Sequence, residues 1–261
     1  MTRFLAIIRV TLLQLIGRRR SIGLLVLAAV PAVILLLVGI NEAERETEEF
    51  FRRGILPLIL GVTVPIIAII LGSGSLGDER THKTISYLAL RPIRREVIAA
   101  AKLTATWLAS FLVAGSGAFL AAIALGITVG SWDEMLAIMI ATAITTLGFV
   151  AIMQVVGYLT DRAVVIGLGY LLIWEGIVTG AASAVATTSI WRMGASAYAG
   201  IIAGDHWGSA LGLEARVVAD LEDLLAGVLP GVWGALFKVL GISVVSVVAL
   251  GYLMRDRDLV S

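Results

Sequence analysis

Two charged side chains lie inside apolar stretches of this chain, where a charge is costly. Glu175 falls within the run Ala163–Ser183, and Lys238 falls within Gly231–Met254. A charged side chain near the middle of a bilayer costs about 2.5–3.5 kcal/mol on insertion scales. By helical rise, both residues lie about 10–12 Å below the same membrane surface. We hypothesise that they form an ion pair or jointly line a polar path. The alternative is that Lys238 extends to the interface while Glu175 is protonated or lies near the interface.

Uncharged polar side chains also occur within the apolar run Met135–Leu159. They are Thr142, Thr145, Thr146 and Gln154. Such side chains usually form hydrogen bonds between membrane helices, and we expect that role here. Contact with a transported substrate is the alternative, and Gln154 is then part of the path.

The residue types needed for catalysis or metal binding are not gathered together. The chain has no cysteine, which excludes thiolate ligands and cysteine nucleophiles. His82 and His206 are predicted on opposite sides of the membrane, and Glu175 has no catalytic partner at its depth. Gly72–Gly77 lacks the Lys and Ser/Thr that complete a phosphate loop. We therefore predict no catalytic residue, no metal and no cofactor in this chain.

The intramembrane polar residues lie within a pattern of six apolar runs. Of the 261 residues 59% are hydrophobic, with a mean hydropathy of +0.99, against roughly 45–50% apolar residues in soluble domains. Each run has the roughly 20 residues that a helix needs to cross a bilayer core. The runs are Ser21–Ile40, Gly54–Gly77, Leu103–Val129, Met135–Leu159, Ala163–Ser183 and Gly231–Met254. We predict an all-α membrane protein with one transmembrane domain over residues 1–261.

Lysine and arginine are distributed unevenly between alternate loops. Most lie before the first run, between the second and third, in the turn Thr160–Arg162, or after the last run. Cytoplasmic loops carry the excess of positive charge. Both termini are therefore predicted in the cytoplasm, in a multi-pass protein of the plasma membrane.

Two segments outside the runs are also predicted to be helical. Apolar residues recur at helical spacing near the N-terminus, which predicts an interfacial helix on the inner leaflet; they are Phe4, Ile7, Ile8, Leu12 and Leu15. An unstructured basic leader is the alternative. In the long outer segment Ala184–Pro230, apolar residues recur between Leu211 and Leu225, and we expect one or two short helices resting at the membrane surface, with Trp191 and Trp207 as anchors.

The charged segment Asp78–Arg95 lies between the second and third apolar runs. Ile85, Leu88 and Ala89 share one face of a short helix, which could insert into a groove on a soluble partner. The arginines that follow, including Arg94, can interact with anionic lipid. An ordinary basic loop beside the membrane is the alternative.

This segment resembles that of the ABC-2 type transporter permeases. The resemblance rests on Glu79, Arg80, Thr84, Ile85, Tyr87, Leu88, Pro92, Arg94 and Lys102. Many members have Gly where this chain has Lys83, so the turn at the start of the helix differs. The run Trp174–Gly176 is also similar to a feature of some members.

The resemblance implies a membrane subunit that is not itself an enzyme. A separate ATPase subunit would bind ATP and magnesium, and would couple to the short cytoplasmic helix formed by Glu79, Arg80, Thr84, Ile85, Leu88, Pro92 and Arg94. Two permease subunits, identical or different, would face each other in the membrane lipid and form the path, with export the expected direction. Two alternatives are a structural or assembly subunit of a membrane complex, and an intramembrane enzyme that uses Glu175.

Overall fold

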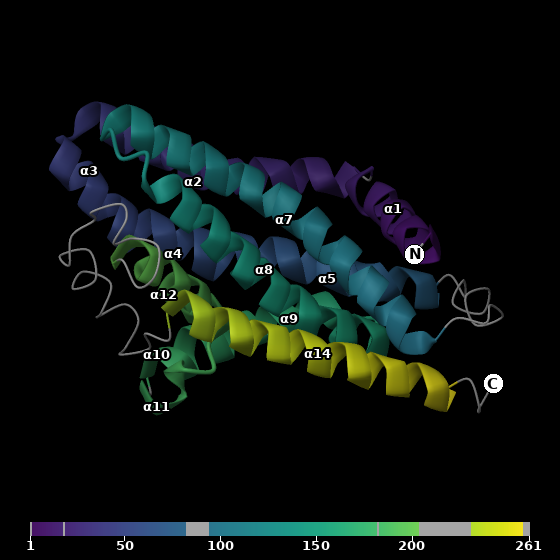
Figure 1. The fold of residues 1–261 in the computed structure, drawn as a ribbon. Coiled ribbons are helices and arrows are strands. Elements are labelled where there is room, and N and C mark those ends of the chain that lie inside the picture. Colours follow the sequence, from purple (N-terminus) through teal and green to yellow (C-terminus); the bar gives the residue numbers. More distant parts are fainter. Residues whose placement is uncertain (1, 18, 82–93, 182, 204–230, 258–261) are drawn as a thin grey trace.

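Helices account for all the regular structure in the part of the chain that the computed structural model describes, residues 2–17, 19–81, 94–181, 183–203 and 231–257 (Figure 1). The all-α prediction is confirmed for these residues. The longer helices are α1 (Thr2–Ile16), α2 (Arg19–Asn41), α5 (Val64–Thr81), α7 (Arg95–Thr128), α8 (Glu134–Leu159), α12 (Ile190–Ala203) and α14 (Gly231–Arg257). The shorter ones are α3 (Glu44–Phe50), α4 (Leu56–Leu58), α9 (Ala163–Tyr170), α10 (Thr179–Ala181) and α11 (Ser183–Ala186).

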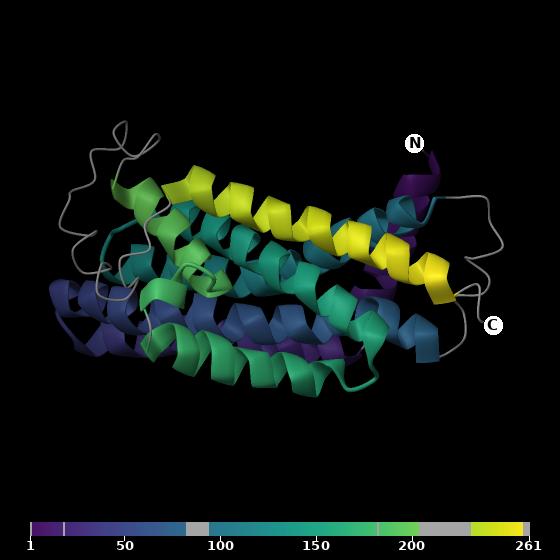
Figure 2. The same cartoon turned by 90° about the horizontal axis from the view of Figure 1, so that it is seen from below.

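The long helices pack lengthwise into one bundle with two distinct ends (Figures 1 and 2). α1 begins and α14 ends at one of them, which we call the terminal end; α5 also ends there and α7 begins there. α3 and the first residues of α8 and α14 lie at the opposite end. From α2 onward, successive long helices therefore alternate in direction along the bundle.

Five helices among the described residues are long and apolar enough to cross a membrane. They are Arg20–Asn41, Glu44–Ser75, Arg95–Thr128, Glu134–Leu159 and Gly231–Arg255. The remaining predicted run, Ala163–Ser183, contains a shorter apolar helix, Ala163–Val178. The crossing of the membrane by all six runs stays a prediction.

The second apolar run belongs to a helix that begins earlier than its hydropathy suggests. It starts at Glu44 rather than near Gly54, and its charged first turns are joined by an ion pair between Arg53 Nη1 and Glu49 Oε1 at 2.7 Å. Two π-helical segments, η1 (Phe51–Ile55) and η2 (Ile59–Thr63), interrupt it. Each segment ends two residues before a proline, Pro57 or Pro65. Because proline lacks a backbone N–H, the wider π turns rearrange the hydrogen bonds ahead of it.

Small residues allow neighbouring helices to approach closely at two places. A Cβ atom added to Gly117 of α7 would overlap the backbone of Ala28 in α2, and one added to Gly157 of α8 would overlap the backbone of Ser73 in α5. Close approach through glycine is the usual device of helix packing in membranes. α7 therefore packs closely against α2, and α8 packs closely against α5.

A helix, α1, lies where the sequence predicts an N-terminal helix, and its predicted apolar face packs toward the bundle. Its location at the membrane interface stays a prediction. Leu15 is buried, and Leu12 packs against the hydrophobic core. A second set of apolar side chains is exposed on α1: Leu5, Val10 and Leu13. The helix is therefore apolar on more than one side.

A further helix, α12, follows the run Ala163–Ser183 and is buried in the bundle. The surface helices that the sequence predicts between Leu211 and Leu225 lie outside the described residues. α12 packs against α8, α14 and η2, and the Ile190 side chain at its start reaches Gly148, about midway along α8. Trp191, the predicted interfacial anchor, packs against Gly61 of η2. α12 was not predicted from the sequence, because it is only 14 residues long and rich in Gly and Ala, so no apolar run of spanning length marks it. Trp207 lies outside the described residues.

Candidate functional site

The buried carboxylate of Glu175 holds the start of α12. Glu175 lies in the π-helical segment η3 (Leu171–Val178) and is 3% exposed. Its Oε1 atom accepts hydrogen bonds from the Tyr170 hydroxyl at 3.0 Å and from the backbone N–H of Ile190 at 2.9 Å. Its Oε2 atom accepts one from the Ser189 hydroxyl at 2.5 Å. Three donors therefore satisfy a carboxylate that is closed off from water.

The local sequence explains why the carboxylate lies there. Ser189 is the residue before α12, and its Oγ also accepts the N–H of Arg192 at 3.3 Å, as an N-cap does. The first N–H groups of a helix lack partners and carry partial positive charge, which a carboxylate compensates. The guanidinium of Arg192 adds a Coulombic attraction to Glu175 and lies 5.0 Å from the ring centroid of Trp191. Glu175 therefore acts as a cap for a helix that starts inside the bundle.

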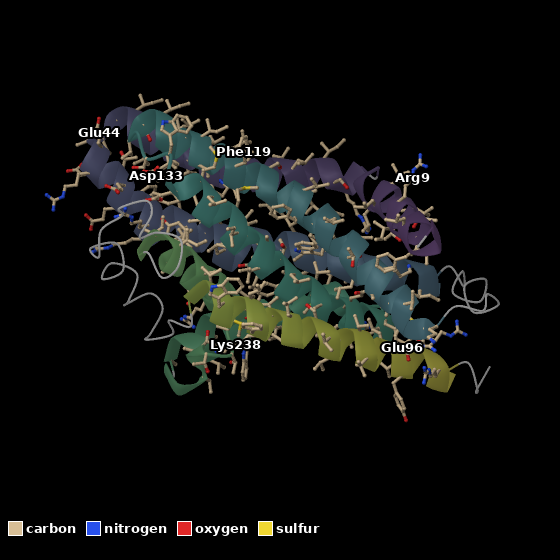
Figure 3. All side chains as sticks on the ribbon, viewed as in Figure 1. Arg9, Glu44, Glu96, Phe119, Asp133 and Lys238 are labelled. Atoms are coloured by element: carbon tan, nitrogen blue, oxygen red, sulfur yellow. The ribbon has the colours of Figure 1, made fainter. Side chains whose placement is uncertain are left out.

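Glu175 and Lys238 are not paired in the structure. Lys238 is exposed on α14, in the part nearer to Gly231 (Figure 3), and forms no ion pair with any described residue. The physical reason is that Tyr170, Ser189 and the backbone of Ile190 already satisfy the Glu175 carboxylate. The sequence does not reveal that Ser189 and Ile190 lie beside it. The alternative role, a polar path lined by both residues, stays a prediction.

A second buried carboxylate, Glu134, accepts a hydrogen bond from the second half of α12. The Tyr198 hydroxyl donates a hydrogen bond to Glu134 Oε2 at 2.7 Å, and Tyr198 is fully buried. Arg52 Nη2 lies 3.1 Å from Glu134 Oε1 and 2.5 Å from Glu48 Oε1. The network joins α12, α8 and the helix that begins at Glu44. Sequence reasoning missed it, because Glu134 reads as part of a turn and its partner Tyr198 is distant in the chain.

Among the described residues, the polar side chains Thr142, Thr145, Thr146 and Gln154 of α8 form no hydrogen bond to another helix. The Thr145 and Thr146 hydroxyls donate to carbonyls four residues earlier in their own helix, at 2.8 Å in both cases. Such local bonds compete with contacts to another helix. The Thr142 hydroxyl and both amide atoms of Gln154 are buried without a hydrogen-bond partner among the described residues. A substrate contact for Gln154 stays a prediction.

The residues predicted to couple to an ATPase lie at the terminal end or outside the described residues. Glu79 and Arg80 belong to the last turn of α5, although their side chains are not described. Arg94 is exposed immediately before α7. The others lie in the segment 82–93, outside the described residues: Thr84, Ile85, Leu88 and Pro92.

Two contacts connect the helices on either side of that segment to the bundle. Lys102 of α7, 1% exposed, donates a hydrogen bond from Nζ to the backbone carbonyl of Ser75 in α5, at 3.2 Å. Glu96, in the first turn of α7, pairs through Oε1 with Arg255 Nη2 near the end of α14, at 2.5 Å. α7 is thus attached to both α5 and α14 close to the terminal end.

Comparison with known proteins places this bundle in a family. No curated protein matches the chain. Residues 16–192 match a family described as ABC-2 family transporter protein. The match covers more than half of the chain and includes Glu175 with its partners Ser189 and Ile190, whereas Lys238 lies beyond it. The chain therefore belongs to the ABC-2 family of transporter membrane proteins.

Proposed function

We propose that this chain is the permease subunit of an ABC-2 exporter in the plasma membrane. A separate ATPase subunit hydrolyses ATP with magnesium, and a second permease subunit completes the translocation path. The single observation that carries the proposal is the family match over residues 16–192. The bundle of apolar helices supports it, because a permease must pass its substrate through the bilayer.

The terminal end of the bundle is the side on which we place the ATPase. The basic residues of the sequence concentrate in the segments at this end, which supports a cytoplasmic location. The segment 82–93 links α5 to α7 in the sequence, and its Ile85 and Leu88 are predicted to share an apolar face that docks on a partner. Because Lys102 and Glu96 tie α7 to α5 and α14, a push on the segment would move three helices together.

The contacts of Glu175 support a structural role rather than a catalytic one. Its two oxygens accept bonds from Tyr170, Ser189 and the backbone of Ile190. A general acid or base must instead reach the reacting atom of a substrate. This argues for the permease over an intramembrane enzyme.

Affinity purification in mild detergent tests the proposal. The tagged chain should retain a P-loop ATPase, identified by mass spectrometry, and the double variant Ile85→Asp/Leu88→Asp should lose it. The matched control is Thr160→Asp, which adds a carboxylate in the turn between α8 and α9 at the same end.

The control should retain the ATPase as the wild type does. If the wild type yields no ATPase under conditions that preserve other membrane complexes, the permease proposal is wrong. If the double variant keeps the ATPase, the partner docks elsewhere and the coupling segment is misassigned.

A further inference from the structure

An apolar groove runs between α8 and α14 on the outside of the bundle. It has a volume of about 390 Å³ and is open along its length. Ile152, Val155 and Val156 form one wall, and Ile242, Val245, Ser246 and Ala249 form the other. In a membrane, a groove of this composition faces the acyl chains of lipids.

Lys238 lies on the same face of α14 as the groove. The spacing from Lys238 to Ile242, Val245 and Ala249 is four, seven and eleven residues, which places all four within about 60° around the helix axis. Lys238 is exposed, and no described residue forms an ion pair with it. A cation that pairs with none of the described residues thus lies in line with an apolar groove.

The depths of Lys238 and of the groove match those of the headgroup and the acyl chain of a lipid. Lys238 lies about 10 Å along the axis from Gly231, where α14 begins at the opposite end. Its side chain can extend toward the headgroup level, as lysines near a helix end do. The α14 wall of the groove starts about 6 Å further in and continues for about 10 Å. A headgroup at Lys238 would therefore have its acyl chain in the groove.

We propose that α8 and α14 form a binding site for a lipid with an anionic headgroup. Lys238 binds the headgroup, and the groove takes one acyl chain. Charge complementarity decides the class of lipid, because an anionic headgroup offers a net charge to the Lys238 ammonium and a zwitterionic headgroup does not. The site does not depend on the transport proposal, because it requires only that α14 lies in a bilayer.

Native mass spectrometry of the purified chain measures this binding. The probes are phosphatidylglycerol and phosphatidylcholine with the same acyl chains. The wild type should retain phosphatidylglycerol preferentially, and Lys238→Gln should lower that retention about fivefold, the effect of losing one lysine beside an anionic lipid. Lys238→Arg should preserve it.

Filling the groove tests the second half of the site. Val245→Trp should reduce retention of both lipids, because the indole occupies the space of the acyl chain. Val244→Trp is the matched control, since Val244 is also exposed on α14 but does not line the groove. Gel filtration before each measurement verifies that the variants remain folded.

Three results would overturn the proposal. One is equal retention of the two lipids by the wild type, and another is unchanged phosphatidylglycerol retention by Lys238→Gln. The third is covering of the groove by a second copy, which Val245→Cys would report as a disulfide-linked dimer in membranes; because the chain has no other cysteine, such a link is unambiguous. Loss of the ATPase partner would leave the lipid measurement unaffected, so the two proposals fail separately.

Discussion

At the scale of single residues, two buried carboxylates decide where α12 lies. Glu175 accepts hydrogen bonds from the Ser189 hydroxyl and the Ile190 N–H at the start of α12. Glu134 accepts one from the Tyr198 hydroxyl further along α12. Hydrogen bonds to charged acceptors are stronger than neutral ones, and a buried donor left without a partner is costly. Both acids therefore contribute to stability through the groups that they satisfy.

Removing the Glu175 carboxylate should destabilise the protein. Glu175→Leu leaves the Ser189 hydroxyl, the Tyr170 hydroxyl and the Ile190 N–H without an acceptor, and each buried unsatisfied group costs about 1–3 kcal/mol. Glu175→Gln keeps one carbonyl acceptor and should cost less. The midpoint of thermal unfolding in detergent, followed by gel filtration, measures both. A leucine variant as stable as the glutamine variant would refute the capping role.

The bond between Tyr198 and Glu134 should appear as a coupling energy. Tyr198→Phe and Glu134→Gln should each destabilise the protein, and the double variant should cost less than the sum of the two. For a hydrogen bond to a charged group, we expect a coupling of about 1.5–3 kcal/mol. Denaturant unfolding of the four proteins completes the cycle. Additive effects would show that the two side chains do not stabilise each other.

At the scale of elements, the bounds of a helix could be predicted where the helix contains a long apolar run. The spans at Arg20–Asn41 and Glu134–Leu159 lie close to their predicted bounds, since hydropathy over roughly 20 residues marks them directly. The start of the second helix at Glu44 was not predicted, because its charged first turns lower the local hydropathy below that of a membrane span. α12 was hidden because it is short and is held by contacts with residues far away in the sequence.

The candidate site was predictable only in part for the same reason. Because Glu175 is a carboxylate inside an apolar run, the sequence predicts that it needs a polar partner. The sequence does not identify that partner. Its donors come from Tyr170, five residues earlier, and from Ser189 and Ile190, across a turn that the sequence does not mark. Glu134 was not singled out, since it lies just before the apolar run Met135–Leu159, where a charged residue is ordinary.

Crowding the contact between α12 and α8 should expel α12 from the bundle. A Cβ atom on Gly194 would overlap the Thr145 hydroxyl, so Gly194→Leu cannot be accommodated. A cysteine introduced at Ala197, which is fully buried, should resist a water-soluble maleimide in the parent protein and react in the Gly194→Leu background. Gly169→Leu is the control, because nothing lies within 4 Å of a Cβ atom there. Protection of Ala197→Cys in both backgrounds would show that α12 tolerates the change.

At the scale of the whole molecule, the bundle has two chemically different ends. The terminal end gathers the helices that flank the segment 82–93, tied by Lys102 and Glu96. The opposite end carries the acid-rich α3 and the Glu134 network. If the terminal end faces the cytoplasm and binds the proposed ATPase, movement driven by ATP would enter through α5 and α7 and reach α12 through α8.

Cysteine labelling should reveal this orientation directly. Trp132→Cys, in the turn before α8 at the opposite end, should react with a membrane-impermeant maleimide in intact cells. Thr160→Cys, in the turn after α8, should react only once the membrane is permeabilised. The chain has no native cysteine, so each signal comes from one position. The reverse pattern would place the coupling segment outside the cell.

The mass of the complex isolated through this chain tests the central claim most directly. The permease account predicts two permease subunits together with P-loop ATPase subunits in one native assembly, whose ATPase component is lost in Ile85→Asp/Leu88→Asp. A native mass equal to this chain alone, or to a complex without an ATPase, would contradict the account.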